Sequence, residues 1–289
     1  MAIETTTANG QHYEVPTPIM AAVLGSLMKY SGCLFLNDKE MLAQAEVNML
    51  QSYVDKADIK MINYIPMPSC GWGSATLFLA RRLPDATIIG FSNSKTQKEH
   101  IVAKAKEQGL GNVRVITGDV IDYEFEHESF DRILSVSHVK NYELLMVKTA
   151  RALRPCGHFF VDVFGHRDTP YHFQEDWMST HFLTGGTMPS QDLLPYFQED
   201  LTVQTQWWVD GHHYRITAEH WVLNWKANKY KVWPHLVGAY REENASAWFN
   251  RWLGYYLAIS EMFEYGEGKT YGVIHLFTKR RNSPPQVRE

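Results

Sequence analysis

The segment Cys70–Ser74, with the sequence CGWGS, decides the fold class of this chain. Two glycines separated by one residue are typical of the tight turn that leaves a strand and opens a helix, where backbone approaches a nucleotide-like ligand. The preceding segment Ile65–Ser69 (IPMPS) is unusual, because Pro66 and Pro68 stand where strand hydrogen bonds should run and no carboxylate ends the strand. The sequence therefore predicts a cofactor fold with a displaced turn and a cofactor site that is damaged or rebuilt.

Strand-like and helix-like segments alternate around this turn. We expect strands at residues 60–65, 86–91, 113–117, 131–136 and 157–164, and helices at residues 74–82, 96–108 and 142–153. Two further helices are expected at residues 19–28 and 39–57, the second with Met41 on its apolar side. This alternation predicts an α/β fold with a parallel sheet, helices on both faces and ligands beyond the carboxyl ends of the strands.

The C-terminal part of the chain has a different composition. Eight of the nine tryptophans lie at Trp177 or later, and the segment is expected to be helical, ending in a strand at residues 273–278. These aromatic residues form either a lid over a small-molecule pocket or an aromatic core or dimer face. The expected organisation is a loose arm at 1–18, a helical segment at 19–58, a core at 59–165, and a cap with the last core strands at 166–289.

Charge and cysteine content restrict the partners and the compartment. The net charge of −4 without a long basic run argues against a nucleic-acid partner. Cys33, Cys70 and Cys156 have no paired spacing, which favours a reduced, cytoplasmic setting. No signal pattern or long apolar run predicts stable membrane insertion. The adjacent His212 and His213 lack the further ligands of a metal site, so no metal is predicted.

A series of short motifs points to one family. The motifs are Tyr30–Phe35, Cys70–Ser74, Ser92–Glu99, Asp131–Ser135, Lys140–Glu143, Asp176–Met178 and Phe182–Pro189. In this order they resemble the coclaurine N-methyltransferases and the related cyclopropane fatty acid synthases, which are class I methyltransferases that use S-adenosylmethionine. The resemblance runs from Tyr30 to Lys279. It implies a Rossmann-like methyltransferase fold with a mostly parallel seven-stranded sheet, N-terminal helices and a helical, aromatic-rich cap.

The resemblance also implies a cofactor site. The residues implied to bind S-adenosylmethionine are Tyr30, Ser31, Gly71, Gly73, Asn93, Gln97 and Asp119. The first two would lie against the methionine part, the glycines would admit the ligand close to the backbone, and the last three would lie near the ribose and adenine. Alternatively, the two glycines form only a strand–helix turn, and Asp119 is a solvated loop acid or a helix cap.

The end of the first strand departs from the family pattern. The family's strand-end aspartate and following glycine correspond to Met67 and Ser69. Losing the carboxylate leaves polar groups of the cofactor short of a partner, at about 1–3 kcal/mol for each buried unsatisfied group. We therefore expect that no cofactor is required, or that S-adenosylmethionine binds weakly.

Two residues are candidates for acid–base catalysis. The family has a Glu-His pair that orients the amine and helps to remove its proton; here the preceding loop is shorter, Ser137 replaces the glutamate and His138 remains. His138 alone could act as a base, or it could be a loop histidine bonded to backbone. Asp162 stands where the family usually has histidine. It could be a catalytic group, a partner of His138 or His166, or a structural hydrogen bonder.

These features favour a repurposed enzyme. The main hypothesis is cofactor-independent cyclisation, rearrangement or proton transfer on a small apolar natural-product-like substrate, with His138 and Asp162 as acid–base groups. The predicted walls of the substrate pocket are Tyr142, Trp177, Trp208 and Tyr271. The alternatives are an active S-adenosylmethionine-dependent N-methyltransferase of a small amine and a non-catalytic binding protein of the same fold. The aromatic C-terminal half is compatible with a homodimer.

Overall fold

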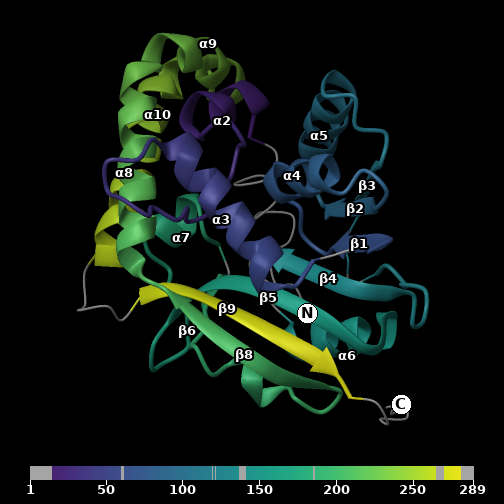
Figure 1. Ribbon diagram of the computed structural model, residues 1–289. Helices are drawn as coiled ribbons and strands as arrows, with labels where there is room; N and C mark the ends of the chain where they lie inside the picture. The colour runs from purple at the N-terminus through teal and green to yellow at the C-terminus, as the bar shows by residue number, and fades with distance from the viewer. Residues whose placement is uncertain are drawn as a thin grey trace.

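A split sheet forms the centre of the chain (Figure 1). The computed structural model describes residues 15–59, 62–118, 120, 122–136, 141–184, 186–264 and 270–280. One part of the sheet has the strand order β1-β2-β3, and the other has the order β4-β5-β9-β8. The bounds are β1 Tyr64–Met67, β2 Thr87–Ser92, β3 Val113–Thr117, β4 Phe130–Val136, β5 Leu153–His166, β8 Leu201–Val209 and β9 Thr270–Lys279.

Most of this sheet is parallel, as the sequence predicted. The strands β1, β2 and β3 run parallel, β4 is parallel to β5, and β9 is antiparallel to both β5 and β8. A separate antiparallel pair is formed by β6 (Tyr171–His172) and β7 (Thr187–Met188). In the described part of the chain, the seven strands of the main sheet and the flanking helices form the mostly parallel α/β architecture that the sequence predicted.

The two prolines of β1 explain why the sheet is split. The backbone bonds from β1 to β2 use its odd-numbered positions, beginning with the 2.8 Å bond that the carbonyl of Asn63 accepts. Pro66 and Pro68 therefore lack the amide donors that would face β4. The one described backbone pairing across this seam is Ser69 with Ser135. The prediction that the prolines interrupt the strand is thus wrong for the β2 side, where Pro66 pairs in register, and confirmed for the β4 side.

The helices fall into two groups. Their bounds are α2 Thr17–Val23, α3 Leu42–Lys56, α4 Ser74–Arg82, α5 Lys95–Glu107, α6 Tyr142–Ala152, α7 Trp177–His181, α8 Gly211–Ala227, α9 Lys229–Tyr240 and α10 Glu242–Glu264, with a 3-10 turn at Leu194–Tyr196. The helices α4 and α5 lie with β1–β3 at the right of Figure 1. We call α2, α8, α9 and α10 the helical cap, since α8 packs on α10 and α2 on α8 and α9.

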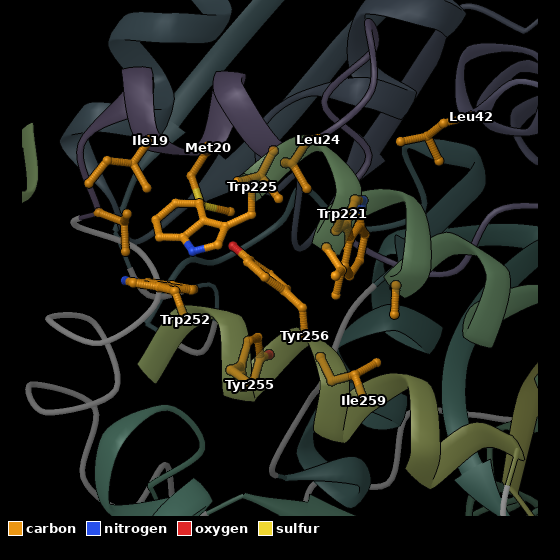
Figure 2. Packing of buried hydrophobic residues seen from close by; sticks show 14 of the residues in the cluster. Ile19, Met20, Leu24, Leu42, Trp221, Trp225, Trp252, Tyr255, Tyr256 and Ile259 are labelled. Atoms are coloured by element: carbon orange, nitrogen blue, oxygen red, sulfur yellow. The ribbon is translucent and has the colours of Figure 1, made fainter. Parts of the chain in front are cut away.

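Aromatic residues form the interior of the helical cap. Trp221, Trp225, Trp252 and Tyr256 are fully buried and lie side by side in Figure 2, where Met20 of α2 joins them. The indole N–H of Trp225 donates to a backbone carbonyl of α10 at 3.0 Å, so this large ring carries no unsatisfied donor. Of the alternatives left open by the sequence, the aromatic core is therefore confirmed for these residues.

Several element boundaries differ from the sequence-based expectation. The first helix ends at Val23 rather than at residue 28, because the chain turns extended and Met28 has a φ of 53°. The second helix begins at Leu42, and Met41 before it is 72% exposed rather than on a buried side. The first strand begins at Tyr64, four residues later than expected, and β8 was not expected at all.

Candidate active site

A cavity of about 240 Å³ lies at the carboxyl ends of β1, β4 and β5. The strand residues that line it are Met67, Val136, Asp162, Val163, Phe164, Val209 and Gly272. Its other walls include the turn after β1, the loop at residues 30–33, the residues Leu183, Thr184 and Gly186, and the start of α8. This is the edge at which ligands bind in parallel α/β sheets, so the cavity is the candidate active site.

The two glycines of the turn have different tasks. Gly71 lines the cavity with a φ of 50°, and no atom lies within 4 Å of the position that a Cβ would take. Gly73 has a φ of 86°, but a Cβ there would stand 2.5 Å from Cγ1 of Ile101 in α5. Gly71 therefore leaves room for a ligand, whereas Gly73 is required for packing between α4 and α5 and is not among the lining residues.

The start of α4 faces the same cavity. Ser74 and Ala75 line it, and the first intrahelical bond of α4 is donated by Leu77 to Gly73 at 2.8 Å. The preceding amides of the first turn have no partner of this kind, and they carry the positive end of the helix dipole. A bond of 2.9 Å from the amide of Cys70 to the end of β2 fixes the turn. The arrangement suits an anionic group such as a carboxylate.

Only part of the motif after β2 reaches the cavity. Ser94 caps α5 by accepting the amide of Gln97 at 3.1 Å, and the hydroxyl of Ser92 donates to Oε1 of Gln97 at 2.6 Å. These bonds fix the side chain of Gln97 at the cavity wall. Asn93 is exposed and does not line the described cavity. Asp119 lies outside the described residues.

Asp162 is the buried carboxylate of the cavity wall. It lies on β5 opposite Val136 of β4, and the hydroxyl of Tyr53 in α3 donates to its Oδ2. Burial raises the pKa of Asp162, while the nearby Lys29 and the bond from Tyr53 act in the opposite direction. A carboxylate in these surroundings can bind a cationic group of a ligand or exchange a proton with it. His138, its predicted catalytic companion, lies outside the described residues.

The sequence profile described as "Mycolic acid cyclopropane synthetase" matches residues 2–271. The chain belongs to this family. It is 33% identical over 293 residues to (S)-coclaurine N-methyltransferase of Thalictrum flavum subsp. glaucum, covering 97% of this chain and 81% of the relative. It is 32% identical over 291 residues to the (S)-coclaurine N-methyltransferase of Papaver somniferum, covering 97% and 83%.

Solved structures agree with this assignment. Coclaurine N-methyltransferase bound to N-methylheliamine and S-adenosylhomocysteine matches with a TM-score of 0.90 and 31% identity over 96% of this chain and 83% of that chain. The mycolic acid cyclopropane synthase CmaA1, in complex with S-adenosylhomocysteine and CTAB, has a TM-score of 0.79 at 19% identity, covering 96% and 99%. Members of the synthetase family thus bind S-adenosylhomocysteine, and the relatives favour the N-methyltransferase alternative over the main sequence-based hypothesis.

Residues at the start of α8 line the cavity although the sequence did not single them out as site residues. Asp210 caps α8 by accepting the amide of His212 at 2.9 Å. Nδ1 of His213 accepts the amide of Phe35 at 3.4 Å, and burial lowers the pKa of this histidine. Tyr214 follows in the same turn. In the sequence, His213-Tyr214 follows the family pattern and Asp210 is an N-cap residue before a helix, but neither signal tells which residues face a ligand.

The four predicted substrate walls are not brought to this cavity. Tyr142, the first residue of α6, is buried against Phe197, with ring centres 6.3 Å apart. Trp177 is 44% and Trp208 64% exposed, and Trp208 packs at 6.3 Å from Tyr271 across β8 and β9. The sequence showed that these residues are aromatic, but side-chain direction along β8, β9 and the helices placed them elsewhere. The aromatic walls of the described cavity include Tyr30, Phe164, Phe173, Tyr214 and Tyr255.

Neither a metal-binding cluster nor a membrane-spanning helix is present among the residues that the structure describes. They contain no group of three or more histidine, cysteine, aspartate or glutamate side chains arranged to hold a metal ion. Among the helices that the structure describes, none combines the length and the apolar character that crossing a membrane requires.

Proposed function

We propose that this chain transfers the methyl group of S-adenosylmethionine to the nitrogen of a small amine. The observation that carries the proposal is a single cavity that joins the open Gly71 turn to the buried carboxylate of Asp162. Support also comes from coclaurine N-methyltransferase, with which the chain shares 33% identity over 97% of its length.

The residues around the turn fit S-adenosylmethionine. The space at Gly71 and the free amides at the start of α4 suit the carboxylate of its methionine part. Gln97 is fixed on the wall beside them, where an amide can bond to nucleoside hydroxyls. By resemblance, Tyr30 and Ser31 complete the methionine side, and both line the cavity. When bound, S-adenosylmethionine supplies a methyl group activated by a sulfonium.

The opposite wall suits a protonated amine. Asp162 offers a buried negative charge, and Tyr214 and Tyr255 present aromatic rings to the same space. Anionic and aromatic groups together favour a cationic nitrogen over a neutral or anionic ligand. Tyr255 is held by stacking on Phe182, with ring centres 4.4 Å apart, so this wall is preorganised.

In the proposed reaction, the lone pair of the amine nitrogen forms the new C–N bond while the C–S bond breaks and S-adenosylhomocysteine leaves as the neutral thioether. A secondary amine bound in its protonated form must first lose one proton to free this lone pair, and the product is then a protonated tertiary amine. Asp162 can accept this proton, because burial raises its pKa above that of an exposed carboxyl group. The role of His138 as a further base stays a prediction.

The experiment is a coupled binding and turnover measurement. Purified protein is titrated with S-adenosylhomocysteine by calorimetry and then incubated with S-adenosylmethionine and secondary amines that carry an aromatic ring, such as N-methylheliamine without its N-methyl group. We expect binding and one S-adenosylhomocysteine released per N-methylated product. Asp162→Asn should lower turnover by about 10²-fold or more, whereas the exposed Asp85→Asn should not change it. Binding without any N-methylation of such amines would overturn the proposal.

A second candidate is favoured by one observation. Met67 ends β1 where a carboxylate is missing, and its sulfur lies 3.4 Å from the hydroxyl of Thr76. If S-adenosylhomocysteine does not bind to the folded protein, cofactor-independent cyclisation, rearrangement or proton transfer in the same cavity becomes the better hypothesis.

A further inference from the structure

A lysine is completely buried behind the cavity wall. The side chain of Lys29 is 1% exposed, and an ammonium is almost never buried to this extent without partners. Its Nζ donates to the hydroxyl of Ser31 and to the carbonyl of Gly32, both at 2.6 Å. Lys29 therefore holds the same loop that presents Tyr30 and Ser31 to the cavity.

A buried glutamate holds the other side of this loop. Glu46 of α3 is completely buried and accepts the amides of Leu27 at 2.9 Å and of Lys29 at 3.0 Å. Its carboxylate also occupies the space beside Gly25, where a Cβ would collide with it. The backbone of the loop is thus fixed by Glu46, and its tip is fixed by the ammonium of Lys29.

Lys29 is linked to the cavity carboxylate through one aromatic ring. Its Nζ lies 5.4 Å from the ring centre of Tyr53, and the hydroxyl of Tyr53 donates to Asp162. The positive charge of Lys29 is also the largest influence that lowers the pKa of Asp162 against the effect of burial. The chain of contacts runs from the loop through Lys29 and Tyr53 to the inner wall.

We propose that Lys29 is a positioning residue of this site: its buried ammonium keeps the carboxylate of Asp162 ionised and fixes the loop of Tyr30 and Ser31 against the bound ligand. This inference rests on the proposed function for the identity of the ligand, but its electrostatic part concerns the ligand-free protein. Lys29 itself does not line the cavity, so it acts through its neighbours.

The other titratable groups that act on Asp162 are few in the described structure. Tyr53 and Lys56 come from α3, and Tyr214 from α8. Lys56 also lowers the pKa of Asp162, but less than Lys29 does, and its Nζ lies 5.9 Å from the ring centre of Trp207. Lys56→Met is therefore a matched control that removes a nearby positive charge and leaves the loop untouched.

The first readout needs no ligand. Infrared difference spectra between the parent protein and its Asp162→Asn derivative isolate the carboxylic acid band of Asp162, which is followed against pH. We expect Lys29→Met to raise the midpoint by about one pH unit or more, as loss of a close opposite charge does. Lys56→Met should shift it less. An unchanged midpoint in Lys29→Met would overturn the inference, whatever the outcome of the methylation assay.

The second readout is calorimetric titration with S-adenosylhomocysteine. We expect Lys29→Met to weaken binding by about tenfold or more, equal to the loss of one charge-assisted bond, and Lys56→Met to leave it unchanged. Equal weakening in both variants would contradict the loop-fixing role. If Lys29→Met does not fold, Lys29→Gln replaces it, because an amide can still donate to Ser31 and Gly32 while the positive charge is removed. An unshifted midpoint in Lys29→Gln would then overturn the inference. If no variant or parent binds S-adenosylhomocysteine but the infrared shift is present, the proposed function fails and the link from Lys29 to Asp162 stands.

Discussion

Ser69 and Ser135 form an isolated parallel bridge, and this is the one backbone pairing between β1 and β4 in the described part of the chain. The bridge lies directly before the glycine turn, so it fixes the turn at the point where the two halves of the sheet meet. Pro66 and Pro68 lack the donors that would extend the pairing. The cavity therefore opens at a seam that is held by packing more than by a hydrogen-bond ladder.

Restoring a backbone amide donor at this seam should extend the pairing between β1 and β4. In Pro68→Val, the new amide faces β4 beside Ser69, and one added bond is worth about 1 kcal/mol. We expect hydrogen exchange of β4 to slow by about fivefold, measured by mass spectrometry. The free energy of unfolding should change little, since proline replacement also frees the unfolded chain. Pro84→Val, in an exposed loop, is the control. Equal hydrogen exchange of β4 in both variants would contradict the claim that the missing donor of Pro68 limits the pairing with β4.

The two glycines of the turn should respond differently to alanine. Gly71→Ala puts a methyl group into open cavity space at a strained φ, so we expect about 1 kcal/mol of lost stability and a loss of S-adenosylhomocysteine affinity. Gly73→Ala forces a methyl group against Ile101, and it should cost about 1–3 kcal/mol in urea denaturation. A larger loss of stability in Gly71→Ala than in Gly73→Ala would contradict this assignment.

Asp162→Asn should change how stability depends on pH. The folded-state pKa of Asp162 is raised by burial, so its contribution to stability is complete below the unfolded pKa, about 3.9, and is lost as pH rises through the folded value. We therefore expect the variant to become more stable relative to wild type as the pH rises above about 4. Urea denaturation across this range measures the difference. For Asp85→Asn, the difference in stability from wild type should not change with pH. A difference that does not change with pH for Asp162→Asn would contradict the raised pKa of Asp162.

His275 should make the protein acid-sensitive. It is completely buried on β9, with its Nε2 3.1 Å from the carbonyl of Gln191, and burial lowers its pKa from 6.5 to about 4. Between these values the unfolded chain binds the proton and the folded one does not. Stability should therefore fall by about 3 kcal/mol as pH drops through this window. His275→Gln should remove this dependence and the exposed His127→Gln should keep it; thermal unfolding at several pH values distinguishes them.

The three thiols should differ in reactivity. Burial raises the pKa of Cys33 and of Cys70 to about 12, whereas Cys156 is exposed. Since the thiolate is the reactive form, a water-soluble thiol reagent at mild pH should label Cys156 in the native protein and the other two only after unfolding. Mass spectrometry of labelled peptides checks this. Rapid native labelling that persists in Cys156→Ser would mean that the cavity thiols are accessible.

The sequence predicted those features that depend on local pattern. The glycine turn, the alternation of strands and helices, and the departures at Met67 and Ser69 are all readable from the order of residues, since each reports a local backbone or strand-end requirement. The sequence motifs also identified Gly71, Gln97 and Asp162 as site residues, and the structure places all three around one cavity. It could not separate Gly71 from Gly73, because the difference lies in whether Ile101 of another helix occupies the space.

The sequence by itself determined the family, the fold and the positions at which the chain departs from its relatives. Only the tertiary structure decided which aromatic residues form the core of the cap and which line the cavity, because that depends on how the faces of distant elements meet. It also brought Lys29, Tyr53 and Asp162 together from a loop, a helix and a strand. Buried charge is stabilised by such non-local partners, and no local pattern of residues records them.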